Sequence, residues 1–183
     1  MSNNFKLMMC FAIGCVFLHG WVLAGEPAKQ NSYHETKWEE LIPDSWNPEK
    51  IFDQLDLDKF SDDDPRAASK VLEALNEAWR NAPANQALQG QRIKIPGFVA
   101  PLDWENDAQL KEFLLVPYFG ACIHVPPPPA NQIIYIKMDV PLKGIRMMDI
   151  VWVYGTIAVE KNDSGDMGAS SYSMRPDKVE PYK

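Results

Sequence analysis

The clearest pattern of apolar and polar positions lies in residues 65–80 and predicts an amphipathic helix. Apolar side chains recur there every three or four residues, and charged or polar side chains occupy the positions between them. Asp64 is a favoured N-cap, Pro65 is a favoured first helical residue, and Pro83 ends the helix. The apolar positions are Ala68, Val71, Leu72, Leu75, Ala78 and Trp79. We expect one buried face and one solvated face.

The chain before this helix is predicted to hold only short elements. Residues 25–36 are polar and follow no pattern, which is typical of a flexible lead-in. Residues 38–43 predict a brief helical turn that ends at a proline, and residues 48–57 predict a second short helix. The acidic residues within 56–64 lack the glycine and the ligand spacing of a calcium-binding EF-hand loop. We interpret them as capping residues of the following helix.

After residue 90 the pattern changes to the alternation that is typical of β-strands. A proline and a glycine at 96–97 predict a bend in the first strand, and Gly155 predicts a bulge in the fourth. Residues 103–112 predict a loop with a helical turn, and residues 162–166 predict a hairpin turn. The predicted strands are 92–99, 113–119, 133–138, 149–160 and 169–174.

These elements predict a mainly β protein with a short α-helical N-terminal part. Five short strands with one mid-chain insertion are typical of a small OB-like Greek-key β-barrel, and a β-sandwich fragment is the alternative. The predicted organisation has three parts. Residues 1–24 form a signal peptide, residues 25–89 form a flexible lead-in and helical N-terminal segment, and residues 90–183 form the β-barrel domain.

Residues 1–24 have the order of a secretory signal peptide. Lys6 is followed by an apolar run from Leu7 to Leu23 and then by Ala24, a small residue suited to a cleavage site. We therefore expect export to the periplasm. An uncleaved N-terminal anchor and a lipid on Cys15 are the two alternatives, and they are the only routes by which we expect a membrane attachment.

Composition narrows the classes of partner. The 183 residues include 25 acidic and 18 basic side chains, a net charge of −7, and the sequence holds no basic run. Proteins that bind nucleic acid neutralise phosphates with lysine and arginine, so we expect no nucleic-acid partner.

The residue with the greatest chemical interest is Cys122. The other two cysteines, Cys10 and Cys15, lie in the predicted leader, so the mature chain offers no partner for an intrachain disulfide. His124 follows two positions later, and an extended chain would place both side chains on one side. The prolines at 126–129 predict a stiff segment beside this pair.

Three interpretations of the pair stay open. As a metal site, Cys122 and His124 are good zinc or copper ligands, and the missing ligands would come from His34, from Asp103 or Glu105, or from another protein. As a catalytic site, a thiol beside an imidazole is an activated nucleophile, although no orienting acid or oxyanion motif is readable. In the third interpretation the thiol is a small core group and the imidazole bonds a carbonyl.

Residues 113–132 read FLLVPYFGACIHVPPPPANQ, and this stretch resembles an uncharacterised family of exported Gram-negative bacterial proteins with a domain of unknown function. The similarity extends over about residues 90–182 and has an echo at residues 38–43. It implies a periplasmic location and a gene setting near ABC-type transport components and metal-responsive genes. It implies no established reaction.

The function that we expect from these observations is that of a periplasmic binding or adaptor protein accessory to ABC-type envelope transport. A link to zinc is part of this hypothesis, with Cys122 and His124 as ligands or contact residues and His34 as a further ligand. The expected partners are ABC-type transport components or periplasmic metal-binding proteins. The alternatives are a thiol-dependent hydrolase or redox enzyme, with Cys122 and His124 as catalytic residues, and a purely structural or interaction module.

Overall fold

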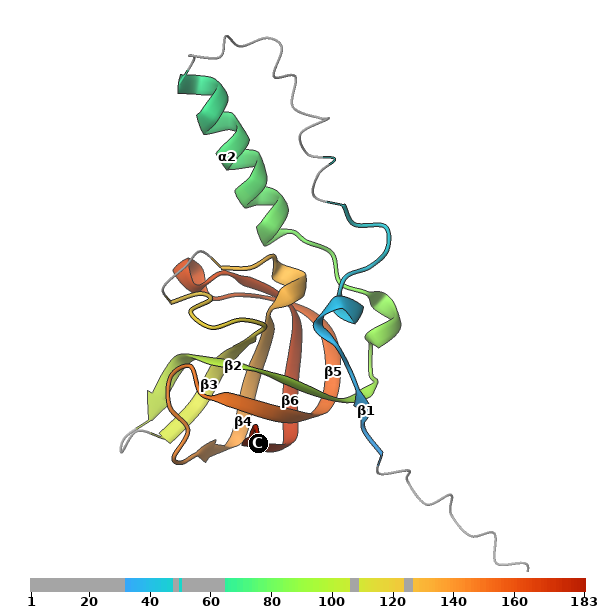
Figure 1. The fold of residues 1–183 in the computed structure, drawn as a ribbon, viewed down its shortest axis with the longest axis vertical. Helices are drawn as coiled ribbons and strands as arrows, with labels where there is room; N and C mark the ends of the chain where they lie inside the picture. The colour runs from blue at the N-terminus through green and yellow to red at the C-terminus, as the bar shows by residue number, and fades with distance from the viewer. Residues whose placement is uncertain (1–31, 48–49, 51–64, 106–108, 124–126) are drawn as a thin grey trace, which may run out of the picture. The chain divides into compact units, whose positions relative to one another are not determined.

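The computed structural model describes residues 32–47, 50, 65–105, 109–123 and 127–183, and five of its strands close into a barrel (Figure 1). These strands are β2 (Arg92–Glu105), β3 (Gln109–Val116), β4 (Ile134–Leu142), β5 (Ile150–Asp163) and β6 (Ala169–Pro181). Their order in the sheet is β2-β3-β4-β6-β5, and β5 pairs again with β2, so the sheet closes.

The strand connections are those of a Greek key. β6 lies between β4 and β5 and runs parallel to β4, whereas the other barrel strands pair antiparallel. This confirms the predicted mainly β fold and the small barrel. The alternative, a β-sandwich fragment, is wrong because β2 and β5 pair over seven residues, Arg92–Phe98 with Ile150–Thr156, and so close the sheet.

Alternation along the strands places one set of side chains inside the barrel. Val151 and Val153 are fully buried in this core, whereas Trp152 between them lies on the outer face. The other buried members of the core on the barrel strands are Ile93, Ile95, Val99, Leu110, Phe113, Leu115, Ile134, Ile136, Met138, Ile157, Tyr172 and Met174. The alternation of apolar and polar residues along each strand therefore determines which side chains meet in the barrel core.

Gly155 marks the predicted irregularity in β5. The register between β5 and β6 shifts between Tyr154 and Gly155, which confirms the predicted bulge. A Cβ atom at this position would lie 2.8 Å from the sulfur of Met174 and 3.0 Å from Cα of Pro176. The close approach of β6 therefore requires a residue without a side chain.

Two strands extend further than the sequence pattern indicates. β2 continues to Glu105 and β3 begins at Gln109, so the predicted loop with a helical turn is wrong for 103–105 and 109–112. Trp104 pairs with Leu110, whose side chain is fully buried, and this single apolar position among polar neighbours is a weak strand signal. The predicted strand 113–119 ends at Val116, and β6 continues to Pro181 by pairing with β5.

The N-terminal part contributes short elements that dock on the barrel. The 3₁₀ helix η1 (Trp38–Leu41) confirms the predicted turn, and the indole N–H of Trp38 donates to the carbonyl of Pro96 at 2.7 Å. The predicted lead-in is not wholly irregular, because β1 (His34–Glu35) pairs in parallel with β2. The leader at 1–24, the acidic residues at 56–64 and, apart from Lys50, the predicted helix at 48–57 lie outside the described residues.

The predicted amphipathic helix is α2 (Pro65–Arg80), which confirms its bounds. Its apolar face is only half-buried, however, and Leu72 is 60% exposed. The guanidinium of Arg80 at its C-terminal end contacts a carboxylate oxygen of Asp163 at 2.6 Å, which ties the helix end to the turn after β5. None of the described helices is long and apolar enough to span a bilayer.

Tyr172 connects the N-terminal elements to the barrel from within the core. Its ring is fully buried, and its hydroxyl donates to the carbonyl of Leu41 in η1 at 2.6 Å. The same hydroxyl accepts the backbone N–H of Asn85, just before the 3₁₀ helix η3 (Gln86–Leu88), also at 2.6 Å. Burial raises the pKa of this hydroxyl to about 12, so it stays a donor at physiological pH.

Replacement of Tyr172 by phenylalanine tests this connection. The Tyr172→Phe variant leaves one buried carbonyl and one buried N–H without their partner, and we expect a loss of about 1–3 kcal/mol in the free energy of unfolding. Urea denaturation measures the loss. Tyr118→Phe is the control, because its side chain is 44% exposed and should leave the midpoint unchanged. Equal midpoints for both variants would contradict the proposed role of the hydroxyl.

Candidate functional site

The segment between β3 and β4 covers the outer face of the barrel. Phe113 and Leu115 of β3 point into the barrel core, so Leu114 and Val116 point outward, yet both are fully buried. Their cover comes from a second apolar cluster outside the barrel wall. Its buried members are Ala100, Leu114, Val116, Ala121, Cys122, Ile133 and Met148. Residues 113–116 of β3 are therefore buried on both faces of the strand.

Cys122 belongs to this outer cluster. Its side chain is 7% exposed, and burial raises the pKa of the thiol to about 12. The reactive and metal-binding form of cysteine is the thiolate, which a pKa this high makes scarce near neutral pH. The described geometry of Cys122 is therefore that of a packed apolar group, and it disfavours a catalytic thiol.

Cys122 also adopts an unusual backbone conformation. Its φ angle is +64°, in the left-handed region, at the end of a tight turn in which the N–H of Ile123 donates to the carbonyl of Gly120. The chain is thus not extended at Cys122, and the spacing that placed its side chain beside His124 does not apply there. His124 lies outside the described residues, so the pairing of the two side chains stays a prediction.

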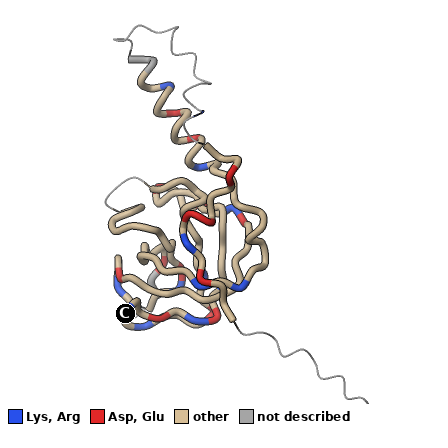
Figure 2. The backbone as a smooth tube through the Cα atoms, turned by 45° about the vertical axis from the view of Figure 1, so that its right-hand side comes forward, with Lys and Arg blue, Asp and Glu red and all other residues tan. Residues whose placement is uncertain are grey.

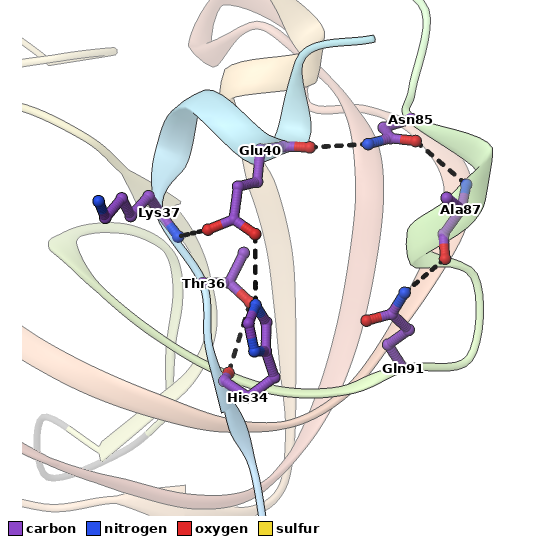
Figure 3. Close-up of polar contacts among 7 residues, drawn as sticks. All are labelled: His34, Thr36, Lys37, Glu40, Asn85, Ala87 and Gln91. Atoms are coloured by element: carbon purple, nitrogen blue, oxygen red, sulfur yellow. Dashed lines mark hydrogen bonds and ion pairs between the residues drawn. The ribbon is translucent and has the colours of Figure 1, made fainter.

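His34, the predicted further ligand, lies on β1 in a different environment. Its Nε2 contacts one carboxylate oxygen of Glu40 at 3.3 Å, and the other oxygen of Glu40 accepts the backbone N–H of Lys37 at 2.8 Å (Figure 3). That N–H bond lowers the pKa of Glu40. Asn85 completes the junction by donating to the carbonyl of Glu40 at 2.9 Å. These contacts are those of a cap that joins η1 to the barrel.

Of the two other ligands predicted on this chain, only Asp103 has a described side chain. Asp103 is exposed on β2, and the side chain of Glu105 is not among those described. Within the described part of the chain, no three or more His, Cys, Asp and Glu side chains lie close enough together to hold a metal ion. The metal site therefore stays a prediction that depends on His124 and on ligands from outside the described residues.

The structure reveals an exposed apolar patch that the sequence pattern did not single out. Phe119 is 66% exposed and Tyr118 is 44% exposed, at the start of the covering segment. Phe119 makes an edge contact with Phe98, with ring centroids 6.0 Å apart, and Phe98 pairs with Ile150. We call this surface the Phe119 patch, and it comprises Phe98, Tyr118, Phe119, Met147 and Ile150.

The patch is supported from beneath by the buried cluster. Gly120 follows Phe119 and has a φ angle of +84°, and its N–H contacts the sulfur of Met148 at 3.1 Å. The N–H of Met148 donates to the carbonyl of Val99 at 2.8 Å, which fixes the turn that carries Met147. The sequence signal for this arrangement was the apolar pair Tyr118 and Phe119, which follows Pro117. The sequence pattern alone assigns this pair to the end of a strand.

Alkylation of the thiol tests the environment of Cys122. Because the thiolate is scarce below about pH 12 and the side chain is buried, iodoacetamide should label this residue at least about tenfold more slowly in the folded chain than in urea at pH 8. Mass spectrometry of the peptide that contains Cys122 measures the rate without interference from Cys10 and Cys15. Labelling of the folded chain at the rate of the unfolded chain would show an accessible, activated thiol.

Comparison with known proteins places the chain in a family. Residues 38–181 match the family described as "Protein of unknown function (DUF3299)". A crystal structure of a DUF3299 family protein from Pseudomonas aeruginosa PAO1 is similar to this chain, with 37% sequence identity and a TM-score of 0.61. The similarity covers 83% of this chain and 97% of that chain. No curated protein matches the chain. The chain therefore belongs to the DUF3299 family of proteins of unknown function.

Proposed function

We propose that this chain is a binding or adaptor protein of the bacterial cell envelope, accessory to ABC-type transport, and that it holds its partner at the Phe119 patch. The observation that carries the proposal is the exposure of Phe119, 66%, directly before the buried residues Ala121 and Cys122. Apart from its edge contact with Phe98, most of this large aromatic side chain lies in water. Aromatic side chains and methionine are enriched at protein interfaces.

The support beneath the patch makes it suitable for binding. A contact surface on a flexible loop loses conformational entropy when it binds, and a preorganised surface avoids much of this loss. Here the residues after Phe119 are held by the sulfur contact of Gly120 and by the burial of Ala121 and Cys122. In this proposal Cys122 supports the contact surface from below, and its thiol does not react.

The envelope part of the proposal rests on the sequence. Residues 1–24 have the order of a signal peptide, and residues 113–132 resemble a family of exported proteins whose genes are expected near ABC-type transport genes. The transport component is therefore the partner class that we propose. A thiol-dependent enzyme is the less favoured alternative, because burial raises the pKa of Cys122 to about 12.

A photocrosslinking experiment identifies the partner at the patch. A photoreactive phenylalanine analogue is placed at position 119 of the full chain in the bacterium that encodes it, and crosslinked proteins are identified by mass spectrometry. We expect a component of an ABC-type transporter. The control position is Asp139, which is 76% exposed and lies outside the patch. Equal crosslinking at both positions, or no transport component at position 119, would overturn the proposal.

Substitution of Phe119 tests how much the patch contributes to the affinity for the partner. With the crosslinked component purified, Phe119→Ala should weaken the complex by about 2 kcal/mol, roughly 30-fold in Kd, because an interface aromatic of this kind is a hot spot. The thermal midpoint should be unchanged, since exposed side chains contribute little to stability. An unchanged Kd in surface plasmon resonance would place the partner elsewhere on the molecule.

The zinc-linked form of this hypothesis has its own test. Protein purified from the periplasm without chelator is analysed for metals beside a Cys122→Ser variant. If Cys122 and His124 ligate zinc, the wild-type chain carries close to one zinc per chain and the variant loses it. We expect equal, substoichiometric zinc in both, because the described residues bring no set of three potential ligands together. If the wild-type chain carries one zinc per chain and the variant carries none, Cys122 is a zinc ligand.

A further inference from the structure

A row of four aromatic side chains lies on the outer face of β5 and of the segments beside it, and it adjoins the Phe119 patch at Ile150, whose carbonyl accepts the backbone N–H of Tyr182 at 2.9 Å. Trp152 and Tyr154 are successive outward positions of β5, because Val151 and Val153 lie in the core. Tyr182 follows β6, and Tyr33 precedes β1. We call these residues, Tyr33, Tyr154, Trp152 and Tyr182, the aromatic row.

The rings of the row are neighbours in space. Trp152 and Tyr182 are stacked, with centroids 5.5 Å apart and planes 24° apart. Cationic side chains lie over the other rings, Lys178 at 5.1 Å from the centre of Tyr154 and Arg92 at 4.5 Å from the centre of Tyr33. Trp152 and Tyr154 lie 6.5 Å apart, and Tyr154 and Tyr33 lie 5.4 Å apart. Tyr182 is 50% exposed, so the row reaches solvent at this end.

Charged side chains of both signs flank the row. Figure 2 shows lysine, arginine, aspartate and glutamate alternating along the strands near the C-terminus. Three ion pairs lie here, with N–O distances of 2.5 to 3.2 Å, and they are Arg92–Asp177, Lys94–Glu35 and Lys178–Glu180. Because the charges are paired, this face does not present the uncompensated positive potential that binds nucleic acid.

A cleft of about 330 Å³ opens beside two of the rings. It is lined by Lys94, Trp152, Tyr154, Glu180, Pro181 and Lys183. The ammonium of Lys94 lies 4.9 Å from the centre of the Trp152 ring, and the carboxylate of Glu180 accepts the hydroxyl of Tyr154 at 2.5 Å. The cleft thus combines aromatic faces with hydrogen-bonding groups of both kinds.

We propose that the aromatic row and this cleft bind an uncharged oligosaccharide. A pyranose ring presents aliphatic C–H groups on its faces and hydroxyl groups at its edge. The C–H groups suit the exposed face of Tyr182 and the part of Trp152 that lines the cleft, and the hydroxyl groups suit Glu180 as acceptor and Lys94 as donor.

The location of the row fits the architecture. OB barrels bind oligosaccharides and oligonucleotides on the face of their second and third strands. In this chain those strands are β3 and β4, and the covering segment between them buries the outer side of Leu114, Val116 and Ile133. An external ligand therefore requires another face, and the aromatic row lies on the strands β5 and β6. This inference is independent of the partner proposed for the Phe119 patch.

Calorimetric titration tests the inference with the full chain and chitotetraose, an uncharged oligosaccharide of N-acetylglucosamine. We expect saturable binding to the wild-type chain and about tenfold weaker binding to Tyr182→Ala and Trp152→Ala. Tyr182 is 50% exposed, so its variant should keep the wild-type thermal midpoint even if Trp152→Ala is destabilised. Phe119→Ala is the matched control, an exposed aromatic on the other patch, and should bind as the wild type does.

Three outcomes would overturn the inference. The first is a wild-type chain that does not bind chitotetraose. The second is a Tyr182→Ala variant that binds as tightly as the wild type, which would leave the row as a set of cross-strand contacts that stabilise the sheet. The third is tighter binding of a thymidine oligonucleotide than of chitotetraose. None of these outcomes bears on crosslinking at position 119, so the two proposals fail separately.

Discussion

The burial of both faces of β3 is the constraint on which the rest of the structure depends. A strand of a small barrel usually buries its inward side chains and leaves its outward ones in water, but the outward residues Leu114 and Val116 are fully buried here. A continuous apolar strand requires a second layer, and the segment between β3 and β4 supplies it. The exposed Phe119, the buried Cys122 and the turn that carries Met147 are all positioned by this one requirement.

Much of the fold could be predicted from the sequence, because the period of each element is strong. The helix at 65–80, the turn at 38–41 and the alternation around Val151 each rest on several residues that agree. The continuation of β2 and β3 toward each other could not be predicted in the same way. Only Trp104 on β2 and Leu110 on β3 are apolar in that stretch, and their pairing is a contact between strands that no local pattern records.

The candidate site was less predictable, for a physical reason. The sequence identified the right segment, since residues 113–132 include the end of β3 and the buried residues Ala121 and Cys122 that cover it, but it could not tell a reactive thiol from a packed one. That difference depends on burial by Ala100, Ile133 and Met148, which come from three separate parts of the chain. The exposure of Phe119 escaped prediction for the same reason. An apolar residue after an apolar strand is expected inside, and only the turn at Gly120 directs the chain otherwise.

The barrel thus has two outer faces with opposite solutions to the same problem. On β2, β3 and β4 the outward apolar residues are covered by the chain itself, and an aromatic side chain emerges only at the margin of the cover. On β5 and β6 the outward aromatic residues are covered only in part, by one another and by Lys94 and Lys178, and paired charges keep the face compatible with water. The Phe119 patch, which stands at the edge of a buried cluster, is suited to a protein partner. The aromatic row, where the charges are balanced, is suited to a neutral polymer that lies along it. The two proposed sites meet on β5, where Ile150 of the patch is followed on the same face by Trp152 of the row, and they are distinguished by the ring that each exposes most, Phe119 in the patch and Tyr182 in the row.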